Sequence, residues 1–309
     1  MLGLCRSVVP VVAFLLLGSA AGAAPRVHHV VVVSFDGGAP AVLRDSRMPT
    51  LLQMARDGVA TWSARTVLPS ITLVAHASML TGVTPRKHGI DWNEWLPERG
   101  LVRVPTIFAL ARRTGLTTAL FAGKEKFRHL LLPGSLGVFS VPSYSARVVA
   151  ASAAAHILAN RPGLCFVHFA GGDGAGHAFG WGSPQQRAAF ATGDRALGML
   201  RQAVESAGIA RSTVFLITAD HGGHGSTHGS ALPADMEIPW VAWGVGVRPG
   251  QAIEGPVSVC DTAATALWLL GVPIPEAMDG RPVARAFASA PGTAPALRTA
   301  GVRARGSIR

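Results

Sequence analysis

Runs of β-branched and other apolar residues recur along the 309-residue chain, and most of them lead into glycine-rich polar sequence. An unbroken apolar run of this length predicts a strand that is buried on both faces, as in a parallel sheet. The run at 238–243 contains a proline, so we expect that strand near an edge. The predicted strands are 27–35, 59–67, 116–122, 164–169, 212–218 and 238–243.

Helical patterns lie between these strands. Several begin near a proline and end near a glycine, which is the usual asymmetry of helix ends. Strands that alternate with helices predict an α/β fold with a mostly parallel central sheet. The predicted helices are 48–58, a helix that begins near 73, 105–115, 143–160, 184–207 and 260–270.

The two ends of the chain differ in composition from the rest. Arg6, an apolar run at 8–17 and small residues at 19–23 have the order of a secretory signal peptide, so we assign residues 1–24 to one. A retained N-terminal anchor is the alternative. Residues 289–309 form a basic tail without acidic residues that we expect to be disordered. The remaining 25–288 are predicted to form one domain, which is exported to the periplasm or secreted and has no transmembrane span.

Composition narrows the function only in part. The chain is 49% hydrophobic, which excludes disorder for most of it. Its net charge of +11 favours an anionic substrate, although loose association with a membrane surface or nucleic acid is equally compatible. Two cysteines remain after the signal segment, Cys165 and Cys260, which is too few for a disulfide framework. Cys165 lies in a predicted buried strand, where we expect a free thiol.

Acidic residues and histidines follow three of the predicted strands. Because the carboxyl ends of parallel strands share one edge of the sheet, these residues can converge there. Each also has an ordinary interpretation as a turn cap or a polar surface loop. The four-residue spacing of Asp173 and His177 suits either a helix or a bent loop, and the surrounding glycines favour the loop. The residues are Asp36, Asp173 with His177, and Asp220 and His221 with His224 and His228.

Three further segments carry polar groups near these ends. Thr72 lies at or just before the helix predicted from about 73, so its hydroxyl would lie near free backbone N–H groups and the positive helix end, or would simply cap the helix. Asn93 can hydrogen-bond a phosphate oxygen or its own loop. Lys124 and Lys126 can bind the outer oxygens of an anion, or can be solvated charges on a turn.

The carboxylates and histidines are sufficient for more than one metal ion. Histidine nitrogen and carboxylate oxygen suit zinc, and manganese or iron can occupy similar sites. Without His224 and with the Thr72 oxygen, these residues give seven candidate ligands, which exceed what one tetrahedral zinc requires. They suit a dinuclear site, in which the ions lie roughly 3.5–4 Å apart.

Several separated motifs together resemble the nucleotide pyrophosphatase/phosphodiesterase branch of the alkaline phosphatase superfamily. The resemblance runs from about Val30 to Phe287 and implies a three-layer αβα sandwich. The motifs are Ser34-Phe35-Asp36-Gly37, Pro69-Ser70-Ile71-Thr72 with His76, Ser78 and Thr81-Gly82, Arg86-Lys87-His88-Gly89-Ile90, Asp173-x-x-x-His177, Asp220-His221-Gly222 and Thr227-His228-Gly229.

The resemblance also implies roles for these residues. One zinc would be held by Asp36, Asp220, His221 and the Thr72 oxygen, and the other by Asp173, His177 and His228. Thr72 would attack phosphorus to form a phospho-threonine intermediate, which water at the second zinc would hydrolyse. Asn93 matches the position of a phosphate-binding asparagine, and His224 is second choice to His228.

The sequence departs from the family pattern, and these differences do not decide whether the substrate is a phosphate monoester or diester. The chain lacks the extra segments of larger phosphodiesterases, and Lys124-x-Lys126 resembles the paired basic residues of related phosphomonoesterases. The absence of a Cys/Ser-x-Pro-x-Arg motif counts against a sulfatase. We therefore expect a hydrolase of small phosphate mono- or diesters, without specific nucleic acid binding. The alternatives are a secreted zinc- or phosphate-binding protein that has lost catalysis, and a phosphotransfer or isomerising enzyme.

Overall fold

The computed structural model describes residues 26–288. The predicted signal peptide (1–24) and basic tail (289–309) therefore lie outside the described residues, and these two assignments stay predictions. Within the described part, no helix has the length and apolarity needed to cross a membrane.

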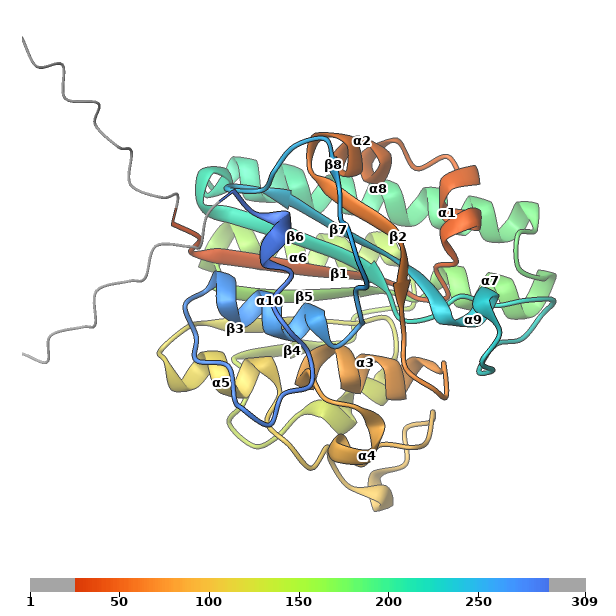
Figure 1. The fold of residues 1–309 in the computed structure, drawn as a ribbon, viewed down its shortest axis with the longest axis horizontal. Helices are drawn as coiled ribbons and strands as arrows, with labels where there is room; N and C mark the ends of the chain where they lie inside the picture. The colour runs from red at the N-terminus through yellow and green to blue at the C-terminus, as the bar shows by residue number, and fades with distance from the viewer. Residues whose placement is uncertain (1–25, 289–309) are drawn as a thin grey trace, which may run out of the picture.

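One eight-stranded sheet forms the centre of the molecule (Figure 1). Its strand order is β4-β3-β5-β1-β6-β7-β2-β8. Only β7 runs antiparallel to its paired neighbours, β6 and β2, so the prediction of a mostly parallel sheet is confirmed. The strands are β1 (His29–Phe35), β2 (Val59–Arg65), β3 (Thr118–Phe121), β4 (Val138–Ser140), β5 (Leu164–Phe169), β6 (Thr213–Ala219), β7 (Glu237–Gly244) and β8 (Gln251–Ala252).

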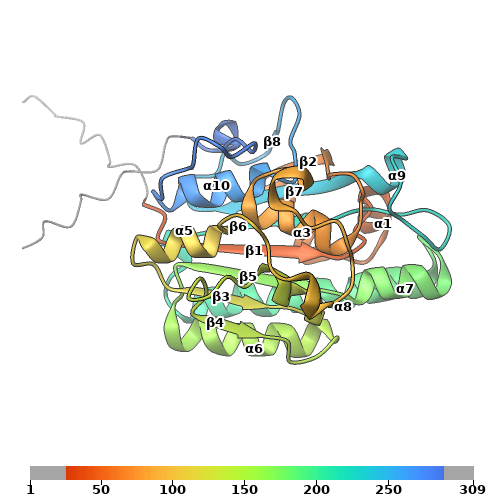
Figure 2. The same ribbon diagram turned by 90° about the horizontal axis from the view of Figure 1, so that it is seen from below.

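Helices cover both faces of this sheet (Figures 1 and 2). The α-helices are α1 (Pro40–Asp45), α2 (Pro49–Asp57), α3 (Thr72–Thr81), α4 (Pro85–His88), α5 (Ile107–Arg113), α6 (Ala146–Asn160), α7 (Gly171–Phe179), α8 (Pro184–Ser206), α9 (Pro233–Met236) and α10 (Asp261–Leu269). Short 3-10 helices are η1 (Pro97–Arg99), η2 (Glu125–Leu130), η3 (Ala210–Ser212) and η4 (Ala284–Ala286). The predicted elements end within three residues of the observed ones.

An apolar core lies on each face of the sheet, between the sheet and the helices that cover that face. Successive residues of a strand point to opposite faces, so Val30 and Val32 of β1 enter one core while Val31 and Val33 enter the other. The first core also contains α3, α5 and α10, and the second contains α2, α6 and α8. This arrangement confirms the expected αβα sandwich. Cys165 and Cys260 are both buried and free, as expected for Cys165.

The prediction that the strand at 238–243 lies near an edge is wrong. β7 pairs with β6 on one side and with β2 on the other. Its proline is accommodated because the register with β2 shifts between Thr61 and Ala64, which face Trp240 and Ile238. The N–H that Pro239 lacks therefore falls at an irregular point of the ladder.

The segment around Asp173 is a helix rather than the expected loop. Its glycines serve close packing: a Cβ at Gly172 would lie 2.2 Å from the ring of Phe190 and 2.8 Å from the Asp36 carbonyl oxygen. A Cβ at Gly176 would lie 2.7 Å from the Gln186 side chain. Glycine thus lets α7 approach α8 and the end of β1, where a larger residue would keep Asp173 away from Asp36.

Two neighbouring glycines of α7 allow a test of whether this close packing stabilises the protein. We expect Gly172→Ala to lower the free energy of unfolding by about 1 to 3 kcal/mol, because the added methyl group overlaps Phe190 and backbone. Gly171→Ala is the control, because its Cβ would meet nothing closer than Ala189 at 3.8 Å. Urea denaturation of both variants measures the difference. Equal stability of the two variants would show that the glycines are not needed for packing.

Candidate metal centre

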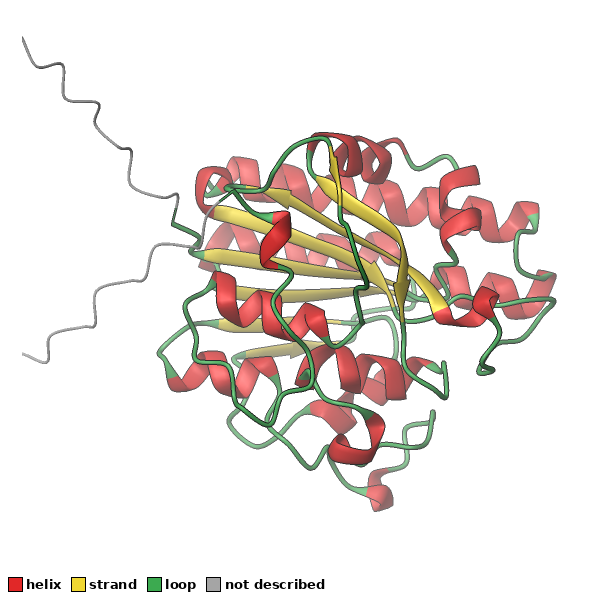
Figure 3. Ribbon diagram, in the orientation of Figure 1, coloured by secondary structure: helices red, strands yellow, loops and turns green. Residues whose placement is uncertain are grey.

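Three buried carboxylates lie beside one another at the same edge of the sheet. Asp36 follows β1, Asp220 follows β6, and Asp173 lies in the first turn of α7, just after β5. Because β1 pairs with β5 on one side and β6 on the other, the three carboxylates come from adjacent strands. Figure 3 shows loops gathered at this edge. The Gly37 N–H donates to Asp220 Oδ1 at 3.1 Å, which fixes one carboxylate against the next strand.

Thr72 begins α3 at this edge. Its buried Oγ1 lies 3.4 Å from each of three atoms, which are Asp36 Oδ1, His221 Nε2 and Lys124 Nζ. The alternative of an N-cap threonine is wrong, because Ile71 occupies the N-cap position and makes no side-chain cap. The hydroxyl therefore faces the carboxylates.

Asn93 supplies a hydrogen bond at the start of α3. Its Oδ1 accepts the Leu73 N–H at 3.0 Å. The side-chain carbonyl is thereby engaged with the helix, and the amide NH2 is the group that can donate to an anion near Thr72.

Three histidines point their Nε2 atoms into this region. In each ring Nδ1 lies within hydrogen-bond distance of a backbone carbonyl oxygen, which can only accept, so Nδ1 carries the proton and Nε2 keeps its lone pair. A backbone bond of this kind is how proteins orient metal-binding histidines. For His177, His221 and His228 the carbonyls are those of Ser226, Gly222 and Ser70, at 2.9, 2.8 and 2.8 Å.

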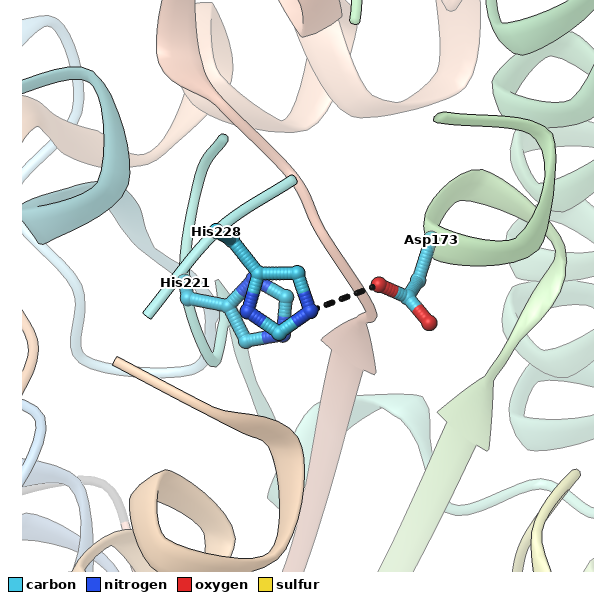
Figure 4. A group of neighbouring side chains, drawn as sticks. All are labelled: Asp173, His221 and His228. Carbon is cyan, nitrogen blue, oxygen red and sulfur yellow. Dashed lines mark ion pairs between the residues drawn. The ribbon is translucent and has the colours of Figure 1, made fainter. Parts of the chain in front are cut away.

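The first candidate group contains Asp173, His177 and His228. Asp173 Oδ1 lies 3.3 Å from His177 Nε2 and 3.4 Å from His228 Nε2. The two Nε2 atoms are 3.1 Å apart. Two lone pairs at this distance repel each other unless a proton or a metal ion lies between them. Burial acts to lower the pKa of His228, but Asp173 and the Ser70 carbonyl outweigh it and raise this pKa. His221 also borders this group, since its ring stacks on that of His228 with centroids 3.8 Å apart (Figure 4).

The second candidate group contains Asp36, Asp220 and His221, all fully buried. His221 Nε2 lies 3.5 Å from Asp36 Oδ1 and 3.3 Å from Asp220 Oδ2. Thr72 Oγ1 borders the same atoms. The seven residues proposed from the sequence therefore converge in two neighbouring groups, with His221 between them.

Unpartnered oxygens show that these groups suit a cation. Among the described residues, four buried side-chain oxygens or nitrogens lack a hydrogen-bond partner, and two of the four are Asp173 Oδ1 and Asp220 Oδ2. One belongs to each group. A buried carboxylate oxygen without a donor is costly, and a metal ion removes that cost. The donor set of imidazole nitrogen and carboxylate oxygen fits zinc and related divalent ions.

The charges of the site are strongly coupled. Burial acts to raise the pKa of Asp36, but Lys124 and His168 outweigh it and hold this pKa well below its usual range. Burial and the charge of Asp36 raise the pKa of Asp220 well above its usual range. Burial lowers the pKa of His221 to about 4, so this ring is neutral at pH 7. A neutral imidazole and a carboxylate that needs a nearby positive charge together favour a metal ion.

Lys124 is largely buried between two carboxylates of the site, whereas the sequence predicts a lysine that binds the outer oxygens of an anion. Its Nζ contacts Asp36 Oδ2 at 2.6 Å and Asp173 Oδ2 at 2.7 Å, and its side chain is only 13% exposed. Burial would lower the pKa of Lys124, but the two carboxylates raise it above its usual value. Lys126 is half-buried, and burial together with Lys124 lowers its pKa. Lys124 thus joins the two groups through Asp36 Oδ2 and Asp173 Oδ2, whereas His177, His221 and His228 lie near the Oδ1 atoms of these carboxylates.

Other residues shape the site without having been assigned a role from the sequence. Trp181 donates its Nε1–H to the Gly37 carbonyl at 3.0 Å, and its ring lies against those of His177 and His228, at 5.3 and 5.7 Å. His76 Nδ1 bonds the Thr72 carbonyl oxygen at 2.7 Å. The four-residue spacing from Thr72 was a usable signal for His76, whereas nothing in the sequence brings Trp181 to this edge.

His224, the second choice to His228 in the sequence, lies outside both groups. Its Nδ1 bonds Asp235 Oδ1 at 2.7 Å, and its side chain is 40% exposed. Asp235 also accepts the Ser230 N–H and hydroxyl, at 2.9 and 2.7 Å. His224 therefore stabilises the loop that carries His228.

The chain is similar in sequence to curated phosphodiesterases. The chain is 25% identical over 236 residues to mouse ectonucleotide pyrophosphatase/phosphodiesterase family member 7, covering 68% of this chain and 54% of the relative. It is 26% identical over 218 residues to the venom phosphodiesterase of Macrovipera lebetinus, covering 62% of this chain and 25% of the relative. The chain thus spans about half the length, or less, of the curated relatives it matches.

Solved structures share the fold. An inactive variant of murine ectonucleotide pyrophosphatase/phosphodiesterase 5 in complex with AMP superposes with a TM-score of 0.70 at 16% identity, covering 80% of this chain and 96% of that one. A 2-O GAG sulfatase superposes with a TM-score of 0.67 at 17% identity, covering 85% and 74%. These similarities confirm the expected alkaline-phosphatase-like fold.

The family follows from the sequence match. Residues 30–112 and 116–232 match the type I phosphodiesterase/nucleotide pyrophosphatase family, and these ranges include the seven residues of the two groups together with Asn93, Lys124 and Lys126. The chain therefore belongs to the type I phosphodiesterase/nucleotide pyrophosphatase family of the alkaline phosphatase superfamily.

Proposed function

We propose that the chain is an exported, metal-dependent hydrolase of small phosphate esters that uses Thr72 as its nucleophile. One observation carries the proposal: the buried Thr72 hydroxyl lies 3.4 Å from Asp36 Oδ1, His221 Nε2 and Lys124 Nζ. A hydroxyl in this setting has a lysine to stabilise the charge of its deprotonated form.

The two groups would each hold one divalent ion, and zinc fits the donor set best. Asp36, Asp220, His221 and the Thr72 oxygen would hold one, and Asp173, His177 and His228 the other. Manganese or iron can use the same ligands. When bound, such ions lower the pKa of hydroxyl groups and water and neutralise phosphoryl oxygens.

The residues of the chain perform the remaining steps. Thr72 Oγ1 loses its proton to solvent and attacks phosphorus, the bond to the leaving oxygen breaks, and that oxygen takes a proton from water. The product is a phospho-threonine, which keeps its second ester group when the substrate is a diester. The Asn93 amide and the first N–H groups of α3 donate to the phosphoryl oxygens as their charge grows. Water then cleaves the phospho-threonine and releases phosphate or a monoester, which regenerates the hydroxyl.

The substrate is proposed to be a nucleotide-type or other small phosphate ester. Support comes from the family and from the AMP complex of the murine structural neighbour. Sulfatases share the fold, but the stretch Pro69-Ser70-Ile71-Thr72 lacks the sulfatase arginine and offers threonine instead. Export rests on residues 1–24.

Metal content tests the two groups separately. We expect Asp173→Asn and Asp220→Asn each to reduce bound zinc from about two ions per chain to about one, because each replaces an anionic carboxylate ligand of one group with a neutral amide. Elemental analysis after dialysis gives the stoichiometry. Asp194→Asn is the matched control: Asp194 is also buried, but it accepts the Thr50 and Leu51 N–H groups instead, at 3.0 and 2.7 Å. Equal zinc loss in the control would refute the assignment.

Removal of the nucleophile tests catalysis. Thr72→Ala is expected to lower kcat for p-nitrophenyl esters by roughly a thousandfold or more, since the attacking oxygen is lost. Thr81→Ala is the control, because Thr81 ends the same helix and its hydroxyl lies outside both groups, where it donates to the Ala77 carbonyl at 2.6 Å and accepts the Val83 N–H at 3.4 Å. Activity should be unchanged in that variant. Wild-type turnover by Thr72→Ala with zinc still bound would exclude Thr72 as the nucleophile.

Substitution of Lys126 tests whether this residue favours monoester over diester substrates. A monoester carries one more negative charge than a diester, so a free ammonium near the site favours the monoester. If Lys126 contacts substrate, Lys126→Met should lower kcat/KM for p-nitrophenyl phosphate about tenfold more than for bis-p-nitrophenyl phosphate. An equal effect on both esters would remove Lys126 from substrate recognition.

A further inference from the structure

His168 occupies an unusual place in the central sheet. It is the only polar side chain in β5, whose sequence is Leu-Cys-Phe-Val-His-Phe, and it is fully buried. Across the ladder it pairs in register with Ser34 of β1, two residues before Asp36. A buried imidazole at this point is costly unless both of its nitrogens find partners.

Both nitrogens do have partners, and these fix the tautomer. The Gly123 backbone N–H donates to His168 Nδ1 at 3.3 Å, so the ring proton is on Nε2. Nε2 then donates to Asp36 Oδ2 at 2.8 Å. This is the reverse of His177, His221 and His228, in which Nδ1 lies against a backbone carbonyl oxygen. His168 therefore acts as a hydrogen-bond donor to Asp36 rather than as a metal ligand.

We propose that His168 is the positioning residue that orients Asp36 for metal binding. His168 and Lys124 both engage Oδ2, at 2.8 and 2.6 Å, and Oδ1 of the same carboxylate is left facing Thr72 and His221, at 3.4 and 3.5 Å. A donor behind a ligating carboxylate sets the direction of the remaining oxygen. This inference rests on the proposed metal site.

The second hydrogen bond of His168, at Nδ1, also affects the group that contains Asp173. Gly123 is the residue before Lys124, so the Nδ1 contact holds the turn from which the lysine reaches Asp36 Oδ2 and Asp173 Oδ2. One imidazole thus links the carboxylate at the end of β1 with the turn after β3. The relative position of the two groups depends on it.

The ring itself has little freedom to rotate. The His76 ring meets it edge-on, with centroids 5.0 Å apart at 88°, and the Phe127 ring lies 4.7 Å away. His76 is bonded in turn to Ser34 Oγ and to the Thr72 carbonyl, at 2.8 and 2.7 Å. Rigid support of this kind is what a positioning role requires.

The test compares two substitutions at His168 in the full-length protein. His168→Leu removes both hydrogen bonds, whereas His168→Gln keeps a donor near the position of Nε2. We expect the zinc dissociation constant, measured by chelator competition, to rise about 10- to 100-fold in the leucine variant. The glutamine variant should recover most of the affinity. The visible absorption of the cobalt-substituted protein should change in the leucine variant and return toward wild type with glutamine.

A second buried histidine provides the control for general destabilisation. His88 is fully buried and bonds Ser78 Oγ and the Ile90 N–H, at 3.0 and 3.1 Å, and it belongs to neither group. His88→Leu should therefore lower stability without changing zinc affinity or the cobalt spectrum. The inference is overturned if His168→Leu binds zinc as wild type does, or if glutamine is no better than leucine. Failure of the wild-type protein to bind zinc would instead overturn the metal site as a whole.

Discussion

The site depends on three carboxylates, Asp36, Asp173 and Asp220, being buried together. Like charges in a low-dielectric interior repel strongly, so the arrangement persists only with positive charge among them. Lys124 supplies one charge through Asp36 Oδ2 and Asp173 Oδ2. It leaves Asp173 Oδ1 and Asp220 Oδ2 without donors. These two oxygens belong to different histidine groups, and this division is the physical basis for proposing two ions rather than one.

The sheet determines why these carboxylates can meet. β1 lies between β5 and β6, and all three run parallel, so the residues just beyond their ends share one edge. This part of the site was predictable from sequence, because each acidic residue follows an apolar run. Thr72 was predictable for a similar reason, since a helix start after a strand lies at the same edge.

Other features were beyond sequence reasoning, for identifiable reasons. Glycines around Asp173 were interpreted as loop formers, but they permit close contact with Phe190 and the Asp36 backbone, which only the tertiary structure shows. Lys124 was assigned to the substrate because its turn follows a strand, whereas its reach to two carboxylates depends on side-chain direction. Pro239 suggested an edge strand, but a register shift in the partner strand accommodates it.

The loop from Asp220 to His228 couples the two groups. His221 stacks on His228 with centroids 3.8 Å apart, and its Nε2 faces Asp36 and Asp220. A displacement of this loop therefore changes both groups at once. His224 holds the loop through its contact with Asp235, and Trp181, which donates to the Gly37 carbonyl, packs against the rings of His177 and His228. Two sets of contacts thus hold the two groups in place relative to each other. Packing around the rings positions the histidines, and the bonds of His168 and Lys124 position the carboxylates.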